Sequence, residues 1–171
     1  MTGRPRARAF DPEDEASGRA YLLRLLKIRE RSEREAADKL LVKGFTPRVV
    51  ASTLAYARRA RLIDDALFAR LWVAGRIKRP LGARRLRWEL RRKGIAPPLI
   101  EKALAVAGAG MREEDVVRAL VRSRIARLSG SPSRKIKERL YRFLARRGFS
   151  QEIIMDVLDR EVSDDETIDD A

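Results

Sequence analysis

One short pattern occurs three times along the chain and constrains the fold more than any other feature of the sequence. A leucine is followed three residues later by a basic residue, then by a glycine and a large apolar residue. The second copy lies 50 residues after the first, and the third lies 54 residues after the second. A glycine directly after an apolar-periodic segment is typical of a helix C-terminus. The pattern therefore predicts three equivalent helix ends, at Leu40–Lys43–Gly44–Phe45, Leu90–Lys93–Gly94–Ile95 and Leu144–Arg147–Gly148–Phe149.

Apolar residues on both sides of these glycines keep the same two offsets. Their spacing fits one face of a helix, and alternating runs of strand length are absent. Each unit thus reads helix, helix, glycine turn, helix, with opening helices expected over about 17–31, 65–79 and 112–128. The fold class predicted is all-α, an elongated tandem array of three three-helix repeats. The matching positions are Ala36, Leu86 and Leu140 upstream, then Val49-Val50, Leu99-Ile100 and Ile153-Ile154, then Leu54, Leu104 and Leu158.

Capping signals support this division of the chain. Ser32 precedes Glu35 by three residues, which is a capping-box pattern, and Thr46 precedes Pro47 as an N-cap precedes a first-turn proline. The predicted domains are a flexible N-terminal segment over 1–16, repeats over 17–62, 63–110 and 111–162, and an acidic flexible tail over 163–171.

Composition removes most catalytic chemistry. The 171 residues include no cysteine and no histidine, which excludes disulfides, thiol nucleophiles and histidine-based acid–base catalysis. The net charge is +14, so a polyanion or an acidic surface is the first partner to consider. No apolar run is long enough to span a membrane. We expect a cytoplasmic, monomeric, non-enzymatic protein that needs no cofactor or metal.

A dense run of positive charge lies within the second repeat. Residues 76–93 hold nine basic side chains and one acid, Glu89. On a helix over 82–93, Leu86 and Leu90 share the inward face and the arginines occupy two outward strips. We predict a contact surface for a polyanion or acidic partner here, made of Arg76, Lys78, Arg79, Arg84, Arg85, Arg87, Arg91, Arg92 and Lys93. A weaker basic patch in the third repeat comprises Lys135, Lys137, Arg139, Arg142, Arg146 and Arg147.

Asp64 and Asp65 allow two interpretations. A carboxylate pair can hold a metal ion, but no third ligand accompanies this one. The interpretation we favour is structural, with one aspartate capping the helix that starts near Asp65 and the other facing the positive end of its dipole. The aromatic residues are expected mostly in the core, with Trp88 partly exposed among its arginines: Phe45, Phe68, Trp72, Trp88, Phe143 and Phe149.

The stretch from Leu62 to Ile95 closely resembles the RecX family of bacterial regulatory proteins. The family pattern runs from an Ile-Asp-Asp turn through Phe-Ala, an aromatic-Val pair, Arg, Gly and Glu-Leu to a Lys-Gly-Ile turn, and every step occurs here in order. The residues that carry it structurally are Asp64, Asp65, Phe68, Ala69, Trp72, Gly82, Leu86, Leu90 and Gly94.

The resemblance implies tandem three-helix repeats and a modulator of the RecA recombinase in DNA repair, recombination and the SOS response. Its partners would be RecA filaments and single- and double-stranded DNA, and its usual effect would be to restrain the RecA ATPase. A second hypothesis is an independent DNA-binding protein that uses the helix at 82–93 for recognition. The acidic tail is either a tethered competitor for the basic surface or a solubilising end.

Overall fold

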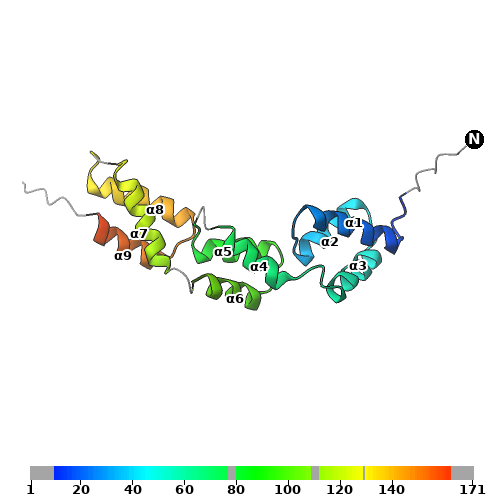
Figure 1. Ribbon diagram of the computed structural model, residues 1–171. Helices are drawn as coiled ribbons and strands as arrows, with labels where there is room; N and C mark the ends of the chain where they lie inside the picture. Colours follow the sequence, from blue (N-terminus) through cyan, green and yellow to red (C-terminus); the bar gives the residue numbers. More distant parts are fainter. Residues whose placement is uncertain (1–9, 77–79, 109–111, 129, 163–171) are drawn as a thin grey trace, which may run out of the picture. The chain divides into compact units, whose positions relative to one another are not determined.

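The computed structural model describes residues 10–76, 80–108, 112–128 and 130–162, and every regular element in those ranges is an α-helix (Figure 1). The predicted all-α class and the three-helix repeats are therefore confirmed. The helices are α1 (Glu15–Ile28), α2 (Glu33–Lys43), α3 (Pro47–Arg59), α4 (Asp65–Ala74), α5 (Ala83–Arg92), α6 (Pro97–Gly108), α7 (Glu113–Ile125), α8 (Ser133–Arg146) and α9 (Gln151–Glu161).

The helix ends follow the local signals in the sequence. The Ser32 hydroxyl accepts a hydrogen bond from the Glu35 amide at the start of α2, and Thr46 caps α3 ahead of Pro47 in the same way. The three repeated glycines all adopt left-handed backbone conformations, with φ of +103°, +80° and +82° at Gly44, Gly94 and Gly148. A side chain is disfavoured in this region, which explains why glycine stands at each turn.

The first helix of each repeat differs from its expected range. The helix expected over 17–31 runs from Glu15 to Ile28, and the one expected over 112–128 ends at Ile125. The helix expected over 65–79 ends at Ala74, directly before Gly75, whose low helix propensity weakens a further turn. Apolar periodicity locates a buried face well but does not mark where the backbone hydrogen bonds stop.

The chain divides into two compact units, of which the first contains residues up to Phe68 together with Lys93–Ile95. In this unit α1, α2 and α3 pack against one another around Leu22, Leu40 and Val49, which are almost wholly buried. Phe45, directly after the Gly44 turn, is also buried, and the ring of Phe10 packs edge-on against it at 5.0 Å. The residue that follows the glycine turn, Phe45, is therefore part of the core of this unit.

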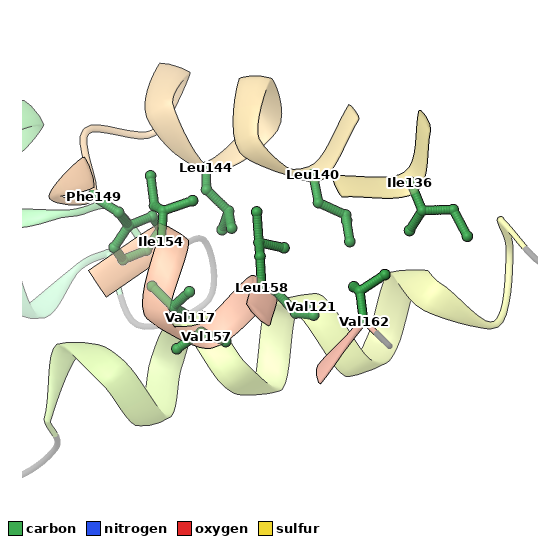
Figure 2. Packing of buried hydrophobic residues seen from close by; sticks show 10 residues of the cluster. All are labelled: Val117, Val121, Ile136, Leu140, Leu144, Phe149, Ile154, Val157, Leu158 and Val162. Carbon is green, nitrogen blue, oxygen red and sulfur yellow. The ribbon is translucent and has the colours of Figure 1, made fainter. Parts of the chain in front are cut away.

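The second unit contains residues 69–92 and those from Ala96 onward. Its largest buried cluster joins α7, α8 and α9, with side chains from all three helices converging in Figure 2. Leu140 and Leu144 of α8 face Val121 of α7 and Leu158 of α9, and all are at most 1% exposed. Phe149, which follows the Gly148 turn as Phe45 follows Gly44, lies in this cluster.

Two glycines meet backbone to backbone within the second unit. The amide of Gly82, just before α5, donates to the Arg147 carbonyl at 2.9 Å, and a Cβ at Gly82 would lie 2.2 Å from the Gly148 carbonyl oxygen. A Cβ at Gly148 would in turn lie 2.5 Å from the Arg85 amide nitrogen. Neither position has room for a side chain, so the start of α5 is held directly against the turn after α8.

An equivalent contact occurs in the first unit. The Ser32 hydroxyl, which is 50 residues before Gly82, donates to the Lys93 carbonyl at 2.7 Å, and a Cβ at Gly94 would lie 2.5 Å from the Arg34 Cβ. Lys93 is likewise 54 residues before Arg147. The repeat pattern therefore preserves this contact as well as the helices.

Candidate functional site

The basic helix predicted over 82–93 is α5, and its inward face is the predicted one. Leu86 is 6% exposed and Leu90 is fully buried. Glu89 occupies the neighbouring strip and accepts three hydrogen bonds. They come from the indole Nε1 of Trp72 at 3.0 Å, from Arg76 at 2.9 Å and from the Nε of Arg85 at 3.2 Å.

The carboxylate of Glu89 on α5 thus binds the indole of Trp72 on α4 and connects the two helices. Partial burial opposes ionisation of the carboxyl, but the hydrogen bonds from Arg76 and Trp72 outweigh it, so the pKa of Glu89 lies below its ordinary value. The Arg76 guanidinium also stacks over the Trp72 ring, 4.3 Å from its centroid. Arg76 and Arg85 were predicted as partner contacts; the structure shows both engaged with Glu89, and Arg76 partly covered.

Counter-charge is less scarce around α5 than the local sequence indicated. Arg87 makes a two-pronged ion pair with Glu101 of α6, with N–O distances of 2.8 and 2.9 Å. This hydrogen-bonded contact raises the pKa of Arg87 and lowers that of Glu101. Lys93 reaches Glu35 of α2 at 2.6 Å. The expectation that Glu89 alone offsets the charge of this stretch is therefore wrong, because the other acids arrive from helices distant in sequence.

Three arginines of α5 stand outside these ion pairs. Arg84, Arg91 and Arg92 are exposed and form no ion pair with any described residue. Trp88 is 46% exposed, as expected, and the guanidiniums of Arg85 and Arg92 lie over its ring at 4.4 and 4.8 Å from the centroid. The exposed part of α5 thus offers arginines positioned by an aromatic side chain. The predicted contacts Lys78 and Arg79 lie outside the described residues.

The weaker basic patch of the third repeat separates into two groups. Lys137 pairs with Asp159 at 3.1 Å and Arg142 with Glu138 at 2.8 Å, while Arg147 donates to the Pro80 carbonyl at 3.2 Å. Arg139, Arg146 and Lys135 form no ion pair within the described part of the chain. Arg139, Arg142 and Arg146 line one cleft with Arg124 and Arg127, two residues that the sequence pattern did not single out. The signal for these two is only their charge, because their proximity to α8 depends on the packing of α7.

Asp64 and Asp65 are structural residues. The Asp64 carboxylate accepts from the amides of Ala66 and Leu67 and so caps α4. Asp65 is the acidic residue of the first turn of α4, as predicted, and its carboxylate also accepts from the Glu33 amide at 2.9 Å, at the start of α2. Burial raises the pKa of Asp65. Among the described residues no group of three or more acidic side chains could hold a metal ion.

Family comparisons match all three repeats. Models for the first, second and third three-helix domains of RecX match residues 19–56, 64–104 and 112–158. The regulatory protein RecX of Mycobacterium sp. (strain KMS) is 40% identical over 158 residues, which cover 90% of this chain and 86% of that protein. The chain belongs to the RecX family of regulatory proteins. A RecX of Chlorobium limicola is 37% identical, over 82% of this chain and 87% of that protein.

Solved RecX structures share the fold. The crystal structure of RecX from Lactobacillus salivarius superposes with a TM-score of 0.76 at 21% identity, covering 85% of this chain and 95% of that one. A second crystal structure of a regulatory protein RecX gives 0.75 at 25% identity, covering 85% of this chain and 73% of that one. Within the described ranges, no helix combines the length and apolarity needed to cross a membrane.

Proposed function

We propose that this chain is a non-enzymatic regulator that binds RecA filaments on DNA and restrains their ATPase and recombinase activity. The observation that carries the proposal is membership of the RecX regulatory family across all three repeats. The exposed arginines Arg84, Arg91 and Arg92 of α5 supply a contact surface, because they form no ion pair with a described residue and an acidic protein surface or a phosphate backbone would neutralise their charge.

The side chains of α5 favour backbone or protein contact over reading of bases. Recognition helices usually read base edges with asparagine, glutamine, serine or threonine beside arginine. This helix contains none of the four, and the whole chain has no asparagine and one glutamine, Gln151. DNA binding, where it occurs, is therefore sequence-tolerant. An independent sequence-specific DNA-binding protein is the less favoured function.

The test is a titration of the RecA ATPase on single-stranded DNA with the full-length chain and a charge-reversed variant, Arg84→Glu with Arg91→Glu. These positions lie on one strip of α5, away from the buried Leu86 and Leu90. Arg87 is left unchanged because its reversal would break the pair with Glu101. Arginine and glutamate have similar helix propensities, so the variant should fold.

The matched control is Lys102→Glu with Arg112→Glu, which changes the net charge equally at two exposed positions of the second unit. We expect the α5 variant to need at least about tenfold more protein for the same inhibition, because attraction is replaced by repulsion. The control should stay close to the parent. Equal inhibition by parent and α5 variant would show that α5 is not the contact surface. A parent without effect on RecA at any concentration would refute the proposed function itself.

A further inference from the structure

A cleft of about 520 Å³ lies in the third repeat, between the end of α7 and one face of α8. Arg139, Arg142 and Arg146 follow one another at intervals of three and four residues, so they share that face of α8. Two further arginines come from α7 and the turn after it. The cleft is lined by Arg124, Arg127, Leu128, Arg139, Leu140, Arg142, Phe143 and Arg146.

The charge in this cleft is almost uncompensated. Five of its lining residues are arginines and none is acidic. Arg142 has one ion pair, with Glu138 at 2.8 Å, and both of these side chains are about 60% exposed. The other four arginines form no ion pair with residues that the structure describes. On α5, by contrast, two of the five arginines form ion pairs, Arg85 with Glu89 and Arg87 with Glu101. The cleft is therefore the stronger anion-attracting feature of the two.

Phe143 shows which part of an anion the cleft can recognise. The guanidinium of Arg124 lies over its ring at 3.8 Å from the centroid, and that of Arg147 lies at 4.5 Å. The ring is therefore occupied by guanidiniums rather than open for a nucleobase to stack. Its role is to orient Arg124 at the cleft. What remains exposed toward a ligand is a set of guanidinium donors, whose planar fork matches the oxygens of a phosphate.

We infer that this cleft binds the phosphodiester backbone of nucleic acid, at a site separate from the arginines of α5. The inference rests on the proposed function in that it assigns the DNA contact of the regulator to a specific place. Arginines from α7, from the turn after it and from α8 suit a nucleic-acid backbone, because its phosphates repeat a negative charge at regular spacing. The lining holds no asparagine, glutamine, serine or threonine, so contacts to phosphates dominate over the reading of bases and the contact tolerates different sequences.

The test compares the full-length parent with Arg127→Glu combined with Arg139→Glu. Neither residue makes an ion pair or ring contact within the described part of the chain, so their replacement breaks no such contact. The control is again Lys102→Glu with Arg112→Glu, which lowers the net charge by the same amount outside the cleft. Fluorescence anisotropy with labelled oligo(dT), and in a second arm with a labelled duplex, measures affinity across a salt series.

We expect the cleft variant to bind oligo(dT) at least about tenfold more weakly near 100 mM salt. The slope of log affinity against log salt should become less negative by about 1.4, because two phosphate contacts with the single strand are lost. The control should retain the parent's slope. An uncharged peptide nucleic acid of the same sequence should not displace the labelled strand. Loss confined to the duplex arm would assign the site to double-stranded DNA, and loss confined to oligo(dT) would assign it to single strands.

Three results would overturn the inference: unchanged binding by the cleft variant, equal loss in the control, or displacement by the uncharged strand. The RecA ATPase of the same proteins separates this failure from failure of the proposed function. A cleft variant that binds both nucleic acids normally but no longer restrains RecA would place an acidic protein surface in the cleft instead. Restraint of RecA by a parent that binds no nucleic acid would refute the cleft inference alone.

Discussion

Replacing Gly148 with alanine tests the backbone contact that holds the start of α5 against the turn after α8. Two costs add at this position. The left-handed backbone, with φ of +82°, costs an L-residue about 1–2 kcal/mol. The new Cβ would also lie 2.5 Å from the Arg85 amide nitrogen and from the Arg85 Cβ. Ordinary contact needs about 3.5 Å, so the neighbouring backbone would have to move by about 1 Å.

Overpacking of this kind typically costs about 1–3 kcal/mol, so we expect Gly148→Ala to destabilise the second unit by about 2–5 kcal/mol in all. Gly130 provides the matched control. Its φ is +87°, and a Cβ there would meet nothing within 4 Å. Gly130→Ala should therefore lower the free energy of unfolding by only about 1–2 kcal/mol, the cost of placing a residue with a Cβ in the left-handed region. The difference between the two variants isolates the contact with α5.

Unfolding in guanidinium chloride, followed by far-ultraviolet circular dichroism, measures the loss of stability in both variants. Hydrogen exchange adds a local readout, because the Gly82 amide donates to the Arg147 carbonyl at 2.9 Å and should lose protection in Gly148→Ala only. Equal destabilisation by the two alanines, with the Gly82 amide still protected, would show that the close approach of α5 to the turn is not a real constraint on the fold.

Two further predictions concern charge. Glu89→Gln should lower stability at neutral pH by about 1–2 kcal/mol, because the hydrogen bonds from Arg76 and Arg85 become weaker. The pKa of Glu89 is depressed in the folded protein, so the stability advantage of the parent is present above the unfolded pKa of about 4.3 and should disappear as pH falls through the folded pKa. Thermal melts in which parent and variant differ equally at all pH values would contradict this prediction. Deleting residues 163–171, which lie outside the described structure, should tighten DNA binding at low salt if the acidic tail competes for the basic surface, whereas anisotropy showing unchanged affinity at every salt concentration would leave only a solubilising role.

The features that sequence predicted well are those that depend on neighbours along the chain. A glycine turn, an N-cap serine and a buried leucine strip each follow from a few adjacent residues, and Gly94, Ser32 and Leu90 were all located correctly. Even the partial exposure of Trp88 followed from its flanking arginines.

The features that sequence missed depend on which helices meet. Glu101 neutralises Arg87 although 14 residues separate them, and Glu35 pairs with Lys93 across 58 residues. Charge counted within the segment 76–93 cannot include such partners. The same reason explains why Arg124 and Arg127 were not grouped with α8: the cleft exists only once α7 packs beside it.

The repeat architecture also links the two arginine surfaces through a single residue. Arg147 accepts from Gly82 through its carbonyl, donates to the Pro80 carbonyl through its guanidinium, and lies over the Phe143 ring that orients Arg124 in the cleft. The segment that leads into α5 is therefore bonded to the residue that packs behind the cleft. Because the backbone contact leaves no room for a Cβ at Gly82 or Gly148, this link is stiff rather than adaptable. The position of the start of α5 relative to the turn after α8 is therefore set by this backbone contact.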